Sequence, residues 1–226
     1  MNIKLKTELP FGDCVVMTAA IHSLHIQFPN QYKTGVDTNH NDLFLNNPHI
    51  SADALDKFKT IEMNYDSIHR SNSVSCNFIN GYVDDLAQQL NIPLKLQTDK
   101  PHLYLTQDEK DKYKDMAPYW IVVVGGKYDL TCKHLCKTYM QQVVDQFIGD
   151  IKFVQSVRKE DMNYVLENTT VVRDITKREM FSLVYNSQGC IGPVTSWQHV
   201  AAAFDKPYIC VAGGREPVQW LSNYPY

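Results

Sequence analysis

Apolar positions along the chain recur in two alternating patterns, short continuous runs and longer stretches with helical spacing. The runs are rich in β-branched residues, and the clearest of them, residues 120–124, is typical of a strand that is buried on both faces. The longer stretches have apolar residues three or four positions apart, as in residues 13–28. Because strands and helices alternate along the whole chain, the pattern predicts an α/β protein with parallel, doubly wound sheets.

The expected strands cover residues 3–5, 34–36, 60–63, 120–124 and 151–155, with two further short strands that end at Ile191 and Val211. The expected helices cover residues 13–28, 78–90, 135–148 and 176–185, with a small-residue helix that begins near Thr195. A charged segment, residues 106–116, separates two halves. Thr106 and Glu109 have the spacing of a capping box, which predicts a solvated helix there. We place the domain boundary after residue 117, which predicts domains 1–117 and 118–226 with a cleft between them.

Charge and cysteine content exclude several classes of protein. Lys and Arg number 22 against 25 Asp and Glu, without a basic run, so no nucleic-acid partner is expected. The amino terminus lacks the apolar stretch of a signal peptide, and no window has the roughly 18 apolar residues of a membrane span, which predicts a soluble, cytoplasmic protein. The six cysteines are interpreted as free thiols. Cys132 and Cys136 have no second ligand pair at zinc spacing, so no metal site is expected.

In an open parallel sheet, ligands bind where the strands end at their carboxyl termini. Four loops of this chain have such a position, and each carries glycine, charged or hydroxyl residues. These loops contain Gly12-Asp13, Gly125-Gly126-Lys127, Pro193–Ser196 and Gly213-Gly214-Arg215. They are the candidate ligand sites.

The turn at Thr195 and Ser196 precedes an expected helix. The unpaired N–H groups and the positive dipole end of such a helix form an anion site that suits a diphosphate. The alternative is that either residue is only an N-cap, which is worth about 1 kcal/mol to the helix. His199 lies one turn later on the same helix face and could reach the same ligand, although a helical histidine is more often a packing or surface residue.

Lys127 and Arg215 each follow a pair of glycines at a strand end. Either cation could bind a phosphate, and the glycines would allow a ligand to approach the backbone closely. The alternative for both is a solvated turn residue. The chain contains neither the P-loop spacing nor G-x-G-x-x-G, which argues against ATP hydrolysis and hydride transfer.

Asp13 is the main candidate for acid–base chemistry. The dipole of the first helix would stabilise its ionised form, so that it could act as a base at neutral pH. The alternative is an ordinary carboxylate at a helix start, worth a few tenths of a kcal/mol. Position alone favours this alternative.

Two segments of the chain resemble one enzyme family. The opening FGDCVVMTAAIHSLHIQFPN is similar to the G-D-x-x-x-x-x-P-x-[IL]-x-x-[IL] start of the ADP-heptose lipopolysaccharide heptosyltransferases, and IGPVTSWQHVAAAFDKP is similar to their G-x-D-[ST]-G-x-x-H-x-A-A-A-x-x-x-P segment. The resemblance is clear over roughly the first 50 residues and from Trp120 onward. It implies a GT-B glycosyltransferase with two Rossmann-like domains, which inverts the anomeric carbon and needs no metal.

The resemblance also implies roles for individual residues. Asp13 would be the catalytic base, with Gly12 beside it on the acceptor side, in an amino-terminal acceptor domain. The carboxyl-terminal domain would hold the nucleotide-diphosphate sugar, for which ADP-heptose is one candidate, without any cofactor. The implied acceptor is a glycan or a lipid-linked glycan, which is compatible with peripheral membrane contact. The donor-binding candidates are Gly126, Lys127, Thr195, Ser196, His199, Gly214 and Arg215.

The chain departs from the family pattern at two positions of the second motif. Val194 and Ser196 stand where the family usually has Asp and Gly, so a side-chain contact to the donor is missing and the sugar need not be heptose. The chain is also short for the family, which is compatible with a fragment or a reduced member. The alternatives are therefore a non-catalytic nucleotide-sugar or glycan-binding module and, with less support, an epimerase.

Overall fold

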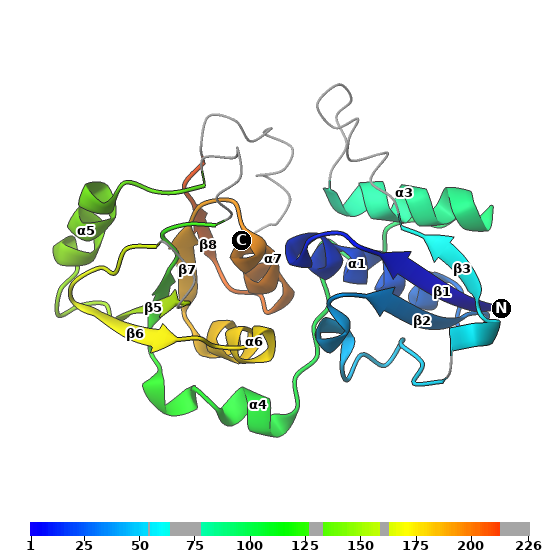
Figure 1. Ribbon diagram of the computed structural model, residues 1–226, viewed down its shortest axis with the longest axis horizontal. Helices are drawn as coiled ribbons and strands as arrows, with labels where there is room; N and C mark the ends of the chain where they lie inside the picture. The colour runs from blue at the N-terminus through cyan, green and yellow to red at the C-terminus, as the bar shows by residue number, and fades with distance from the viewer. Residues whose placement is uncertain (54, 64–77, 127–132, 159–162, 213–226) are drawn as a thin grey trace. The chain divides into compact units, whose positions relative to one another are not determined.

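The computed structural model describes residues 1–53, 55–63, 78–126, 133–158 and 163–212. The chain divides into two compact units. The described part of the first unit ends at Tyr104, and the second begins at Leu105 (Figure 1). Each unit is built on its own parallel sheet, so the mixed α/β class with parallel sheets predicted from the sequence is confirmed. The cleft between the halves stays a prediction.

The sheet of the first unit has three described strands, β1 (Asn2–Thr7), β2 (Lys33–Thr38) and β3 (Lys59–Glu62), in the order β2-β1-β3. Both pairs are parallel, and Thr7 at the end of β1 pairs with Thr38 at the end of β2. The 3₁₀ turns η1 (Asn41–Phe44) and η2 (Leu55–Lys57) lie in the connection from β2 to β3. The connection was predicted to be irregular, and its short turns agree with its content of Asn, Asp and Pro.

Helix α1 (Phe11–Gln27) follows β1 and is the most deeply buried helix of the first unit. Every residue from Cys14 to Ile21 is buried, so this stretch of the helix is covered on all sides and not on a single stripe. Helix α3 (Phe78–Leu90) packs against it. The helix begins two residues before the predicted start at Asp13, because Pro10 can serve as N-cap with no loss of a backbone hydrogen bond.

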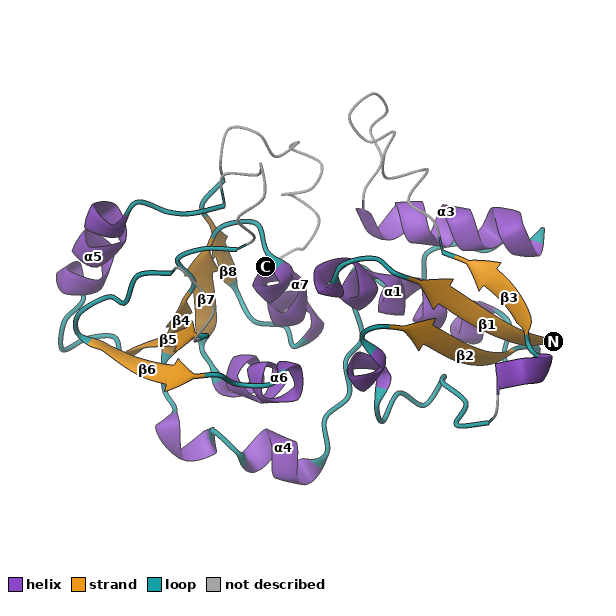
Figure 2. Cartoon of the chain, viewed as in Figure 1, coloured by secondary structure: helices purple, strands orange, loops and turns teal. Residues whose placement is uncertain are grey.

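The sheet of the second unit has five described strands, which are all parallel: β4 (Trp120–Val122), β5 (Phe153–Val157), β6 (Thr169–Arg173), β7 (Gly189–Gly192) and β8 (Tyr208–Cys210). Their order, β6-β5-β4-β7-β8, is the doubly wound 3-2-1-4-5 order within this unit. Helix α5 (Lys137–Gln146) lies on one face of the sheet, and α6 (Lys177–Asn186) and α7 (Ser196–Ala203) lie on the other (Figure 2). The strand order reverses between β4 and β7, which makes their carboxyl ends the switch point where ligands bind in this class of fold.

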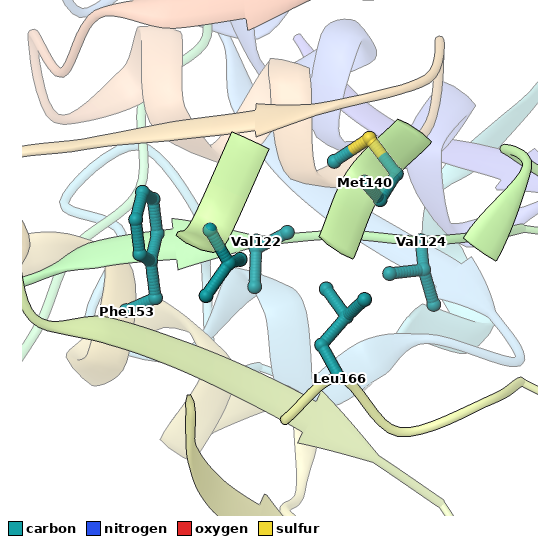
Figure 3. Packing of buried hydrophobic residues seen from close by; sticks show 6 residues of the cluster. Val122, Val124, Met140, Phe153 and Leu166 are labelled. Atoms are coloured by element: carbon teal, nitrogen blue, oxygen red, sulfur yellow. The ribbon is translucent and has the colours of Figure 1, made fainter. Parts of the chain in front are cut away.

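The core under α5 explains why β4 is a continuous apolar run. Val122 on the strand and Val124 just after it pack with Met140 of α5, and Phe153 and Leu166 belong to the same cluster (Figure 3). Ile121 and Val123 are buried as well, and alternation along a strand directs them to the opposite face. Both faces of β4 are therefore covered, as the sequence predicted.

Strand β6 was not predicted from the sequence. Its residues TTVVR are only partly buried, and the strand forms an edge of the sheet with β5 as its neighbour. In the described part of the β5–β6 connection, the buried amide of Gln155 donates to Tyr164 O (2.7 Å) and accepts from Leu166 N (2.9 Å). Long-range pairing and not a local apolar pattern therefore defines this strand.

Helix α4 (Gln107–Asp111), followed by the 3₁₀ turn η4 (Lys114–Met116), has the predicted capping box at Thr106 and Glu109. It packs on α6, which has a capping box of its own at Thr176 and Glu179. The two boxes are linked by reciprocal ion pairs, Arg178 to Glu109 at 2.5 Å and Lys112 to Glu179 at 2.5 Å. These pairs attach residues 106–112 to the second unit, whereas the sequence placed the boundary after residue 117.

Candidate functional site

The switch point of the second unit brings two predicted loops together. Val122 of β4 pairs with Ile191 of β7, and Val123 N donates to Ile191 O at 2.8 Å. The two strands therefore end side by side, and the loops that follow them leave the same edge of the sheet. These loops contain Gly125-Gly126 and Pro193–Thr195.

Gly192 at the end of β7 allows this close approach. A Cβ at Gly192 would lie 2.6 Å from Val123 Cβ and 2.8 Å from Val123 O, so no side chain fits there. The following turn is held by Tyr208 of β8, whose hydroxyl donates to Pro193 O at 2.6 Å. Burial raises the pKa of this hydroxyl, and the neighbouring Thr195 hydroxyl acts in the opposite direction. The start of α7 is thus fixed by packing from both neighbouring strands.

Thr195 is the N-cap residue of α7 but does not act as a side-chain cap. Its backbone is extended, with φ −145° and ψ 177°, and its hydroxyl makes no cap hydrogen bond. The first turn of α7 also contains no acidic residue. The leading amides of a helix have no intrahelical partner, so they remain able to bind an anion. The N-cap alternative is correct for the backbone of Thr195 and does not hold for its side chain.

Lys133 provides a cation next to this turn. The chain returns to the end of β4, where Leu135 N donates to Val124 O at 2.9 Å. A Cβ built on Gly126 would lie 3.0 Å from Thr195 Cγ2 and 3.3 Å from Lys133 Cβ. Gly126, Lys133 and Thr195 are therefore neighbours. Gly126 and Thr195 were predicted from the sequence as donor-site residues, and Lys133 was not.

His199 lies one turn into α7 and belongs to the same group of residues. Burial, together with the positive charge of Lys133, lowers its pKa to about 3. The imidazole is thus neutral throughout the physiological range, while Lys133 is the charged neighbour. His199 was a donor-site candidate from its spacing, and the structure brings it close to Thr195 and Lys133.

Two further polar residues line the end of β4. A Cβ on Gly125 would collide with the side chains of His134 and Asn163, so the glycine is needed for this contact. Among the described residues, Asn163 Oδ1 is buried without a hydrogen-bond partner. Sequence reasoning missed both residues. They reach Gly125 only because the chain returns to the end of β4, and no local sequence pattern indicates that return.

Other predicted residues have different outcomes. Val194 is buried with 7% of its surface exposed, and Ser196 is the first residue of α7 and partly exposed. Lys127, Gly214 and Arg215 lie outside the described residues. Of the predicted donor-side residues, the structure therefore brings together Gly126, Thr195 and His199, with Ser196 beside them.

In the first unit, Asp13 and Gly12 lie in the first turn of α1, where both are partly exposed. Asp13 is the acidic residue of that turn, and its N–H donates to Pro10 O at 3.0 Å. The amino end of a 17-residue helix stabilises a carboxylate in its ionised form. Asp13 can therefore accept a proton from a group that reaches this turn.

The turn that carries Asp13 packs against the end of β2. Cys14 Sγ lies 3.7 Å from Thr38 Oγ1, and the rings of Phe11 and His40 meet edge to face with centroids 5.8 Å apart. Thr38 pairs with Thr7 in the sheet, so these contacts follow from the register of β1 and β2. They hold the first turn of α1 at the carboxyl edge of the three-stranded sheet.

In the part of the chain that the structure describes, no helix is both long and apolar enough to cross a membrane. No group of three or more His, Cys, Asp or Glu side chains among those residues is arranged to hold a metal ion.

Comparison with solved structures identifies the fold. The chain is similar to a family 9 glycosyltransferase from Veillonella parvula, with a TM-score of 0.76 and 12% identity over 100% of this chain and 84% of that one. It is similar to the E. coli heptosyltransferase WaaC with ADP (0.64, 10% identity, 96% and 89% covered). It is also similar to E. coli ADP-heptose LPS heptosyltransferase II (0.63, 13% identity, 93% and 84% covered). No protein-family model matches the sequence, and no curated protein matches it. The chain therefore has the α/β fold of these GT-B-like glycosyltransferases.

Proposed function

We propose that the protein is a glycosyltransferase that moves a sugar from a nucleotide-diphosphate donor to a hydroxyl acceptor. The observation that carries the proposal is the meeting of Gly126, Lys133 and the start of α7, which has no side-chain cap hydrogen bond, at the switch point of the second unit. The shared fold supports it, because the similar structures are named as glycosyltransferases.

The second unit would bind the diphosphate of the donor. The α7 amides and the Lys133 ammonium supply positive charge, and the neutral His199 adds a hydrogen-bonding group without a second charge. The same groups would stabilise the negative charge that develops on the diphosphate as it leaves. We therefore propose that transfer needs no divalent cation.

The first unit would bind the acceptor and activate its hydroxyl group. Asp13 takes the hydroxyl proton while the acceptor oxygen attacks the anomeric carbon. The new glycosidic bond forms as the bond from that carbon to the diphosphate oxygen breaks, and the nucleoside diphosphate leaves with the electron pair. A single displacement of this kind inverts the anomeric configuration.

ADP-heptose is the first donor to test, because WaaC was solved with ADP and with ADP-2-deoxy-2-fluoro heptose. Val194 is buried and apolar where the resembling family has an acidic residue, so we propose that sugar selection differs from that family. The diphosphate contacts proposed here use amides and Lys133 and do not depend on Val194. Glycan and lipid-linked glycan acceptors and a cytoplasmic location remain part of the proposal.

A screen of sugar nucleotides by thermal shift, followed by transfer assays with and without a chelator, tests the proposal. A donor present at 100 times its dissociation constant should stabilise the protein by about 2.7 kcal/mol. We expect transfer to an acceptor that persists in EDTA. Binding without turnover in any acceptor mixture would favour a binding module, donor conversion without acceptor would favour an epimerase, and no binding by any sugar nucleotide would overturn the proposal.

A further inference from the structure

Four histidines that are far apart in the sequence meet in the first unit. His22 and His25 lie one turn apart on α1, His49 lies in the loop after η1, and His102 lies near the end of the unit. We refer to these four side chains as the histidine array. The proposed glycosyl transfer makes no use of them.

The rings of the array form a continuous series of contacts. His102 stacks on His22 with centroids 3.7 Å apart and an interplanar angle of 10°. His22 Nδ1 lies 3.3 Å from His49 Nε2, and His49 stacks on His25 with centroids 4.8 Å apart. Threonine hydroxyls end the series on both sides, Thr98 at 2.9 Å from His102 Nε2 and Thr34 at 2.9 Å from His25 Nε2.

This series of contacts limits how many protons the array can hold. The bond between His22 and His49 needs one donor and one acceptor nitrogen, so a proton on the acceptor breaks it. Stacked rings that both become cations repel each other across a short distance. The array is thus stable with neutral rings, and each added proton opposes its geometry.

The array joins separate parts of the first unit to α1. His102 N donates to Thr18 Oγ1 at 2.8 Å, and Gln97 N donates to Ser23 Oγ at 3.0 Å, so residues 97–102 are attached along the helix. His25 reaches Thr34 of β2, which also forms a bridge with Ile50. Loss of the ring contacts would therefore loosen both the loop at residue 49 and the segment at residues 97–102.

Burial and the neighbouring imidazoles lower the pKa values of His22, His25 and His49. The causes are burial for His49, burial and then His49 for His22, and burial and then both other rings for His25. The charged residues on these elements are Asp13 on α1; Lys33 and Asp37 on β2, which pair with Asp53 and Lys4 respectively; Asp42 on η1; Asp84 and Asp85 on α3; and Lys95, Asp99 and Lys100 before His102. Asp13 lies nine residues from His22, which is about 13 Å along the helix.

We propose that the histidine array is an acid-sensitive latch that holds the loop at residue 49 and the segment at residues 97–102 on α1, and that opens when the imidazoles take up protons. Two pairs of rings stack and one pair is hydrogen-bonded, and this geometry requires neutral rings, so that proton uptake opposes it. The latch is a property of the first unit and is independent of the proposed transfer reaction.

The sign of the effect follows from the pKa shifts. A histidine whose pKa is lowered by folding binds its proton more tightly in the unfolded or open state, so stability is lost as the pH falls below 6.5. Burial, with help from His49 and His22, lowers the pKa of His25 from 6.5 to about 4. By linkage this ring alone weakens closing at pH 5 by at most about 30-fold relative to pH 7.5. Solvent screening of a half-buried ring reduces this, and we expect about tenfold.

Hydrogen exchange measured by mass spectrometry at pH 7.5 and pH 5, after correction for intrinsic rates, tests the latch. In the parent protein, protection of residues 18–27 and 97–102 should be about tenfold lower at pH 5 than at pH 7.5. In the double variant His25→Gln and His49→Gln the fall should shrink to less than threefold, because two of the titrating rings are gone. The comparison is between variant and parent over the same peptides, because the lowered pKa of His199 makes the stability of the second unit depend on pH as well.

Thr34→Val is the matched control. It removes the hydroxyl that His25 contacts and keeps all four imidazoles, so protection should drop at both pH values while the acid dependence remains. If the double variant does not fold, the single variant His25→Gln should show a smaller acid dependence than the parent. An equal acid dependence in parent and folded histidine variants would overturn the proposal.

Discussion

The two strand–turn–helix units at α1 and α7 differ in the charge that they present. Both helices follow a parallel strand, and in neither does the N-cap residue make a side-chain cap hydrogen bond. The first turn of α1 carries the carboxylate of Asp13, whereas the first turn of α7 carries no acidic residue and lies beside Lys133. The positive end of the helix dipole therefore stabilises the carboxylate of Asp13 at α1, whereas at α7 it remains available to the anionic group of a ligand.

This difference separates two chemical tasks. A carboxylate at α1 repels a diphosphate and suits a base, while the start of α7 suits a diphosphate. The histidine of α7, with a pKa of about 3, is too weak a base to accept a proton at neutral pH. In the proposed function each turn therefore performs one half of the reaction. The three predictions below test this separation.

Replacing the base should have the largest effect. Asp13→Asn removes the proton acceptor at α1, and we expect transfer to slow by about 10³-fold. Donor affinity should not change, because the donor contacts belong to the second unit. Steady-state kinetics and calorimetry measure the two quantities separately. Asp84→Asn is the control, because it removes one exposed carboxylate on α3 and so changes the net charge by the same amount; it should leave transfer unchanged. A variant at Asp13 as active as the parent would remove its assigned role.

Removing the cation beside α7 should have an intermediate effect, and the effect should be on donor affinity. Lys133→Met should weaken donor binding by about 30-fold, which corresponds to about 2 kcal/mol for a charge-assisted contact. Lys137→Met, at the exposed start of α5, changes the net charge equally and should leave binding unchanged. Calorimetry at two salt concentrations measures both variants. Equal affinities for the two would show that Lys133 does not contact the donor.

Replacing the N-cap side chain of α7 should have the smallest effect. Thr195→Val keeps the backbone amides, so donor affinity should change less than about threefold. Stability should be nearly unchanged, because the hydroxyl makes no cap hydrogen bond. Thr106→Val and Thr176→Val are matched controls: these hydroxyls accept from Glu109 N and Glu179 N, and their loss should cost about 1 kcal/mol each. A large loss of affinity at Thr195 would mean that the side chain and not the amides binds the donor.

Local sequence patterns predicted most of the fold. The β-branched run at residues 120–124 and the apolar spacing of α1 and α3 identified those elements within a few residues, because both depend on the side chains of the segment itself. Strand β6 was missed since it is a partly buried edge strand whose hydrogen bonds come from β5. The attachment of α4 to α6 was missed for a similar reason, because Arg178 and Glu109 are 69 residues apart.

The candidate site was predictable only in part. Gly126 and Thr195 could be found because each lies after a strand end or at a helix start, and His199 could be found because it lies one turn after Thr195 on the same helix. Lys133 could not be found, because it reaches Gly126 only through the return of the chain to Val124. The histidine array shows the same limit: the sequence places His22 and His25 on one helix face, and only folding adds His49 and His102.

The sequence by itself determined the alternation of strands and helices, the carboxylate in the first turn of α1 and the helix that begins near Thr195, since local spacing and helix electrostatics suffice for these. Only the tertiary structure decided the strand order, and with it which loops meet at the switch point. It also decided which distant side chains become neighbours, because pairing across a sheet depends on contacts between segments that are remote in the chain.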